Sequence, residues 1–132
     1  MGSSEDLGKL LLRLALGVLI LLHGVAKVYA GPGFVLHATA NAGLPAAIGY
    51  LVYIGEVFAP VLLILGIWSR LAALIVACNM LFAIYLVHMG QLWSLNSAGG
   101  WSLELQGMFL LTAVAIALIG AGRFSIGNRR WN

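Results

Sequence analysis

The sequence has very little charge. Of its 132 residues, 8% are Asp, Glu, Lys or Arg, whereas 62% are hydrophobic. A soluble domain is usually about 45–50% apolar and about 25% charged. This small number of charged side chains cannot cover a water-facing surface. The apolar surface must therefore face lipid. The composition predicts an integral membrane protein with a single domain, embedded in a lipid bilayer.

Cysteine is almost absent, because Cys78 is the single one in the chain. This excludes an intrachain disulfide and dithiol chemistry of the CxxC type. It also excludes a CxxCH haem attachment and a cysteine-held iron–sulfur cluster, so a partner protein would have to supply electrons for any redox reaction. The net charge of +3 is not gathered into a basic patch with interleaved aromatics, so we expect no nucleic acid partner.

Four long apolar segments fill most of the chain, at residues 7–28, 44–67, 71–87 and 103–120. Each is close to the length of about 20 residues that a helix needs to cross a bilayer. The segments lack the alternation of membrane β-strands. We therefore predict an all-α fold, an integral membrane four-helix bundle that forms one domain over residues 1–132. Between the first two segments, residues 34–41 are expected to form a short interfacial or re-entrant helix.

The positive charges predict the orientation of the bundle. If the N-terminus is cytoplasmic, Lys27 is the one basic residue toward the outer side. The others lie on the cytoplasmic side: Lys9, Arg13, Arg70, Arg123, Arg129 and Arg130. This bias predicts that both termini are cytoplasmic.

Each of the four predicted membrane segments contributes a polar residue to the middle or outer half of the membrane. Ionised groups at this depth are costly and usually face the bundle interior in pairs. We therefore predict one polar pocket that receives side chains from all four helices: His23, Lys27, Tyr53, Glu56, His88, Glu104 and Gln106.

Glu56 is the strongest candidate for a function, because it lies near the middle of its segment. Pro60 follows four residues later and has no N–H to bond the carbonyl of Glu56. The freed carbonyl and the carboxylate would form an acceptor site at one depth. Its donor would be His23, Lys27, a water, a bound cation or a protonated ligand.

Other polar residues have structural explanations as well. Glu104 follows Ser102, a good helix N-cap residue, and the helix dipole favours a carboxylate in the first turn. His88 would be favoured at a helix C-terminus, and Lys27 could extend to the outer surface. Asn79 is expected to join helices by hydrogen bonding.

The arrangement of these residues resembles the DoxX family of small bacterial membrane proteins. The resemblance is carried by RLALGVLILLHGVAK at 13–27, GEVFAPVLLILGIWSRLAAL at 55–74, NMLFAIYLVH at 79–88, Glu104 and GAGRFSIG at 120–127. It implies a four-helix bundle in the bacterial inner membrane. Some relatives are associated with quinone-linked oxidation, and others act beside superoxide dismutase and thiol-handling partners.

The leading hypothesis is a membrane subunit of a quinone-linked oxidoreductase system. His23 and Glu56 would handle protons, while Lys27, Tyr53, His88, Glu104 and Gln106 would bind the ligand. The possible cofactor is a quinone, and a redox partner protein is expected. Histidine and a buried carboxylate suit proton transfer. The chain could also form a homo-oligomer.

Three alternatives remain open. The first is an intramembrane metal site, although the sequence lacks the Glu-x-x-His pair of di-iron bundles. The second is a proton-coupled small-molecule transporter. The third is a non-catalytic assembly subunit whose polar cluster only locks the bundle.

The predicted topology is testable by cysteine labelling at Asn132 and Ser97. In intact cells, an impermeant thiol reagent should modify a cysteine at position 97 and spare one at 132, because six of the seven basic residues favour cytoplasmic termini. Labelling at 132 but not at 97 would show that the topology is inverted.

Overall fold

The computed structural model describes residues 3–88, 90, 92–127 and 132, except for the side chains of Val87 and His88. Within these residues the regular secondary structure is helical, apart from an isolated β-bridge between Leu95 and Trp101. The predicted all-α fold is confirmed. The helices are α1 (Ser3–Ala30), α2 (Gly33–Asn41), the 3₁₀-helix η1 (Ala46–Tyr50), α3 (Leu51–Tyr53), the π-helix η2 (Ile54–Phe58), α4 (Ala59–Leu65), α5 (Ser69–Ala83), the π-helix η3 (Ile84–His88) and α6 (Glu104–Ile119).

Three helical stretches are long and apolar enough to cross a membrane. They are Ser3–Ala30, Ala46–Leu65 and Ser69–Leu86, with 28, 20 and 18 residues. The second is not one regular helix, because it changes from 3₁₀ to α to π and back to α. The fourth, α6, is apolar but has only 16 residues. The chain is therefore a membrane protein with three to four helices capable of spanning the bilayer.

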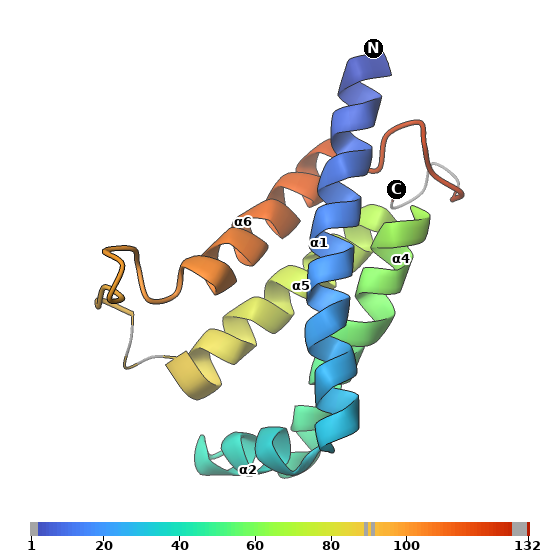
Figure 1. The fold of residues 1–132 in the computed structure, drawn as a ribbon. Helices are drawn as coiled ribbons and strands as arrows, with labels where there is room; N and C mark the ends of the chain where they lie inside the picture. The colour runs from blue at the N-terminus through green and yellow to red at the C-terminus, as the bar shows by residue number, and fades with distance from the viewer. Residues whose placement is uncertain (1–2, 89, 91, 128–131) are drawn as a thin grey trace.

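The predicted short helix after the first span is present as α2. Gly31 has a φ of +84°, a left-handed conformation that a glycine adopts without strain, and Pro32 follows it at the N-cap of α2. The chain turns sharply here, and α2 lies across one end of the bundle (Figure 1). We call this end the α2 end and the opposite one the terminal end.

The four long helical stretches pack in a ring. Helix α1 contacts α4 and α6, and α5 contacts the same two helices from the other side. The α5 helix brings Ala72, Ala73 and Ala77 into the core, and such small side chains let membrane helices approach closely. Further core residues come from all four helices: Leu16, Ile20, Ala59, Leu63, Val76, Met80, Phe109, Ala113 and Ile116.

The terminal end of the bundle is held by two arginines. Arg13 is fully buried and donates to the carbonyl oxygens of Leu63 and Phe124. Arg70 donates to the carbonyls of Ala117 and Leu118 at the end of α6, at 3.0 and 2.8 Å. Each arginine therefore satisfies at least one carbonyl that a helix end leaves without an intrahelical partner, and Arg13 also binds the chain after α6.

The chain ends meet at this terminal end (Figure 1). The backbone N–H of Arg123 donates to the carboxylate of Asp6 in the first turns of α1. Ile126 and Gly127 donate to the carbonyls of Leu65 and Gly66. Both ends of the chain thus lie at one end of the bundle, and the side of the membrane that they face stays a prediction.

One sequence-based expectation about a helix start is wrong. Helix α6 begins at Glu104 with Leu103 at the N-cap, and no side chain caps it. The hydroxyl of Ser102 instead accepts a hydrogen bond from that of Ser94 at 3.0 Å. The β-bridge between Leu95 and Trp101 brings the two serines together, so Ser102 links two parts of the segment that precedes α6.

Helix α1 packs so closely on η2 that a side chain at Gly24 does not fit. A Cβ at this position would collide with the backbone carbonyl of Glu56 and would lie 2.9 Å from a methyl group of Val57. Backbone atoms cannot move aside as a flexible side chain can. Gly24 therefore sets the distance between α1 and η2.

We expect Gly24→Ala to destabilise the protein by about 1–3 kcal/mol, because it overpacks a fixed contact. Gly8→Ala in the same helix is the matched control, since nothing lies within 4 Å of a Cβ there. That control should be neutral or stabilising by up to about 1 kcal/mol, from helix propensity. Thermal unfolding in detergent measures both, and equal midpoints for the two variants would contradict the close contact.

Candidate functional site

The central feature of the candidate site is an ion pair between α1 and η2. The ammonium of Lys27 lies 2.7 Å from Oε1 and 2.5 Å from Oε2 of Glu56, so it bonds both carboxylate oxygens. The Glu56 side chain is 5% exposed and that of Lys27 is 33% exposed. The pair therefore joins a buried acid to a base that reaches the surface near the α2 end.

Tyr53 lies beside this pair, one turn before Glu56. Its hydroxyl donates to the backbone carbonyl of Lys27 at 3.5 Å, a long hydrogen bond. It lies near the ring of Tyr50, with the ring centroids 6.4 Å apart. The last turn of α1 is thus fixed to the second span by two contacts, the ion pair and the Tyr53 hydrogen bond.

Glu56 lies inside a π-helical turn, and this explains how its helix accommodates Pro60. The wider turn covers Ile54–Phe58 and ends directly before Ala59 and Pro60. Proline cannot donate the next helical hydrogen bond, and π turns of this kind often occur at functional sites. The turn buries both Gly55 and Glu56, although they are consecutive residues.

The backbone carbonyl of Glu56 has a different neighbour from the one predicted. It faces Gly24, where a Cβ would collide with it, so α1 covers this oxygen. The sequence suggested that this carbonyl and the carboxylate would form one acceptor site for His23, Lys27, a water, a bound cation or a protonated ligand. The carboxylate is confirmed as an acceptor, and its donor is Lys27.

His23 lies on α1 one turn before Lys27, but it contacts a different helix. Its ring meets that of Phe109 on α6 edge to face, with the centroids 5.8 Å apart and the planes at 77°. It borders a hollow of about 290 Å³ between the two helices, with Leu19, Leu22, Ala26, Leu105 and Phe109. The side chain is exposed in the isolated chain and so faces the surroundings of the bundle.

Glu104 is placed at the connecting segment before α6. It is exposed, and its Oε1 accepts from the side-chain amide of Asn96 at 3.2 Å. Asn96 in turn accepts at Oδ1 from the N–H groups of Ala98 and Gly100. Glu104 thus orders this segment through Asn96, a contact that the spacing of the two residues in the sequence did not signal.

The predicted pocket is therefore brought together in part. Lys27, Tyr53 and Glu56 are joined, whereas His23 and Glu104 lie in separate contacts. Gln106 is half-buried in α6. His88 ends the second π-helix, η3, and its side chain lies outside the described part of the structure. A pocket shared by all seven residues stays a prediction.

Metal ligands were a second possibility for the acidic and histidine side chains. Among the described residues, no group of three or more His, Cys, Asp or Glu side chains lies close enough to hold a metal ion. Three of the described carboxylates are instead engaged by other groups: Glu56 by Lys27, Glu104 by Asn96 and Asp6 by the Arg123 backbone. The contacts that the structure shows at these carboxylates are hydrogen bonds and ion pairs.

Comparison with known proteins agrees with this membrane architecture. Residues 8–89, more than half of the chain, match the DoxX family profile. The chain belongs to the DoxX family. A DoxX relative from Bacillus subtilis (strain 168), named "Putative oxidoreductase CatD", is 27% identical over 121 residues, which cover 92% of this chain and 85% of the relative.

A second relative is an uncharacterized protein of Haemophilus influenzae. It is 28% identical over 121 residues, which cover 89% of this DoxX chain and 87% of that protein. No solved structure matches the chain. Lys27, Tyr53 and Glu56 all lie within the region that matches the family profile.

The unequal burial of the two partners predicts unequal effects of removing them. Lys27→Met leaves the buried carboxylate unpaired and should cost about 3–5 kcal/mol. Glu56→Gln should cost about 1 kcal/mol, because the part-exposed Lys27 can extend to the surface and glutamine still accepts a hydrogen bond.

The double variant Lys27→Met with Glu56→Gln should recover most of the loss caused by Lys27→Met. Thermal unfolding of the four proteins in one detergent forms a complete cycle and gives the coupling energy. Strictly additive effects would show that the two side chains do not interact in the membrane-embedded protein.

Proposed function

We propose that this DoxX protein is a membrane subunit of a quinone-linked oxidoreductase system in the bacterial inner membrane. It binds a quinone or a similar small ligand within the membrane and carries protons to or from it. The observation that supports this most is the Lys27–Glu56 pair, in which a buried carboxylate is connected to a part-exposed ammonium.

The proton chemistry follows from this difference in exposure. Reduction of a quinone to a quinol takes up two electrons and two protons, and oxidation releases them. In the proposal, Glu56 holds a proton at membrane depth and Lys27 exchanges it with water near the α2 end. The chain has one cysteine and so no cysteine-held electron carrier, which assigns the electrons to a partner protein.

The other candidate residues take positions around this pair in the proposal. Tyr53 fixes Lys27 through its backbone carbonyl, which holds the ammonium near the carboxylate. His23 serves as a second proton carrier on α1. His88, Glu104 and Gln106 bind the ligand head from the remaining helices.

The comparisons support a redox role at a coarser level. A relative that matches 92% of this chain carries the word oxidoreductase in its name. The apolar spans provide access to membrane-dissolved molecules, among which quinones are redox-active. A redox partner is implied because this chain supplies protons and a binding place but no electrons.

A second candidate function is non-catalytic assembly. Both oxygens of Glu56 already contact Lys27, so the pair is fully matched without any ligand. Such a pair could lock α1 to η2 and nothing more. A substitution that keeps the hydrogen bond but removes the titrating proton separates the two functions.

Glu56→Gln is that substitution. It should leave the protein folded and inserted but lower quinone-linked turnover by about 10²-fold or more, because general acid–base catalysis contributes about 10²–10⁴-fold. The measurement is quinone reduction or quinol oxidation in membranes from a deletion strain that expresses the variant, with the amount of protein determined in parallel.

Asp6→Asn is the matched control. Asp6 is a second buried carboxylate, but it lies at the terminal end and accepts from the Arg123 backbone. Its replacement should leave turnover per folded protein unchanged. Full turnover in Glu56→Gln would rule out the proton role and favour assembly.

A further inference from the structure

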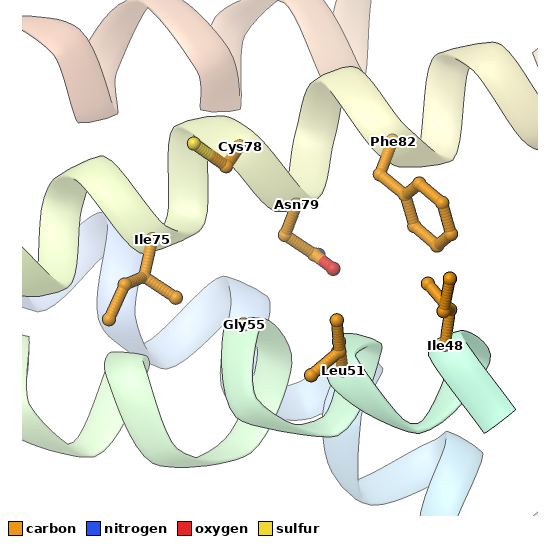
Figure 2. A pocket seen from close by; sticks show the side chains of 7 residues that line it. All are labelled: Ile48, Leu51, Gly55, Ile75, Cys78, Asn79 and Phe82. Atoms are coloured by element: carbon orange, nitrogen blue, oxygen red, sulfur yellow. The ribbon is translucent and has the colours of Figure 1, made fainter.

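A groove opens on the side of the bundle between the second span and α5. It has a volume of about 290 Å³, and its wall comes from η1, α3 and η2 on one side and from α5 on the other. Figure 2 shows the seven residues that line it: Ile48, Leu51, Gly55, Ile75, Cys78, Asn79 and Phe82. All but Asn79 present apolar or weakly polar surface. Small-molecule sites usually occupy about 300–1,000 Å³, so the groove fits one small ring system.

Asn79 places an unpartnered donor in this groove. The residue is 7% exposed, and its Nδ2 is buried without a hydrogen-bond partner in the described structure. In Figure 2 its amide extends from α5 toward the helix that carries Gly55 and Leu51. A buried N–H without a partner is costly, and more so in lipid, where water does not replace the missing acceptor.

Gly55 makes room for this amide. A Cβ at Gly55 would lie 2.5 Å from Cβ and 2.6 Å from Cγ of Asn79, so any larger residue would displace the side chain. The two helices therefore meet closely at this point without satisfying the amide. The expected role of Asn79 as a hydrogen bond between helices is not what the described structure shows.

The groove lies near the middle of the membrane. Asn79 is ten residues into the Ser69–Leu86 span, and Gly55 is near the middle of Ala46–Leu65. Leu51 and Cys78 are exposed at its rim, where the surroundings of the bundle are lipid tails. A ligand would therefore enter sideways from the bilayer and would have to be lipid-soluble.

We infer that this groove is a binding site for a lipid-soluble ring compound that bears a carbonyl oxygen, with Asn79 Nδ2 as the donor to that oxygen. The carbonyls of phospholipids lie at the interface and do not reach this depth. The backbone carbonyls of a neighbouring copy's helix are already bonded within that helix. The carbonyl of a lipid-soluble ring compound can reach this depth and is not already hydrogen-bonded, so it can accept from the Asn79 amide.

This inference deepens the proposed function by placing the ligand ring in this groove, where Glu104 and Gln106 are not among the lining residues. It rests on that function only for the choice of a quinone as probe. Gly55 and Glu56 are consecutive residues of η2, with Gly55 against Asn79 and Glu56 against Lys27. A ring held at Asn79 would therefore lie against the residue of η2 that directly precedes the proposed proton carrier, Glu56.

The test uses the full chain in lipid nanodiscs with ¹⁵N-labelled asparagine. Decylubiquinone, whose ring is fully substituted and does not add to the Cys78 thiol, is titrated against decylbenzene, which has the same tail and no carbonyl. Decylubiquinone should shift the side-chain amide signal of Asn79, whereas decylbenzene should not. Asn79→Leu should weaken decylubiquinone binding about tenfold, the value of one hydrogen bond to a neutral group.

Ser69→Ala is the matched control, because Ser69 Oγ is another buried polar atom of α5 without a partner but lies outside the groove. It should bind decylubiquinone as the unchanged protein does. Equal responses to both probes would overturn the inference and make the groove a place for acyl chains. An Asn79 signal that depends on the protein-to-lipid ratio, and not on the probe, would overturn it in favour of a second copy.

Binding is measured without the partner protein, so its failure and the failure of the proposed function are distinguishable. Carbonyl-dependent binding at Asn79 with full turnover in Glu56→Gln would retain the site and reject the proton role. No binding at Asn79 with lost turnover in Glu56→Gln would reject the site and retain the proton role.

Discussion

The cost of an ionised carboxylate in hydrocarbon governs the arrangement of this bundle. Glu56 is buried in the second span, and Lys27 at the end of α1 neutralises it. For the two to meet, α1 and η2 have to approach until backbone touches backbone, which Gly24 permits. The close packing of α1 on η2 thus depends on the charge of Glu56, which requires a partner, and on Gly24, whose missing side chain lets Lys27 reach that carboxylate.

The same constraint is met differently at the terminal end. Arg13 and Arg70 have no carboxylate partner in the described structure and instead take backbone carbonyls from helix ends and from the chain after α6. The carbonyls at a helix end carry partial negative charge, so an arginine fits there without an acidic residue. Glu56 and the two arginines thus all have partners, whereas Asn79 is a buried polar group within the spans that has an unpartnered donor.

Much of the fold could be predicted from the sequence, because continuous apolar runs in a nearly uncharged chain leave few alternatives. Lys27 was also among the named donors for Glu56. The helix neighbours could not be predicted. His23 and Lys27 share one side of α1, yet one contacts α6 and the other η2, because that side faces the seam between two helices. Spacing gives the direction of a side chain from its own helix but not which helix lies opposite. Pro60 signalled a disturbed turn at Glu56, whereas the π-helix at Ile84–His88 has no proline to mark it.

The π turn at Ile54–Phe58 connects the two features that suggest function. In it, two consecutive residues are buried against different helices: Gly55 against Asn79 of α5, and Glu56 against Lys27 of α1. Because the two residues are adjacent in one turn, a ring that enters beside Asn79 would press on the same backbone segment that carries Glu56. The turn is wider than an α-helix and is followed by Pro60, so a single short segment holds both the residue that faces the groove and the carboxylate that binds Lys27.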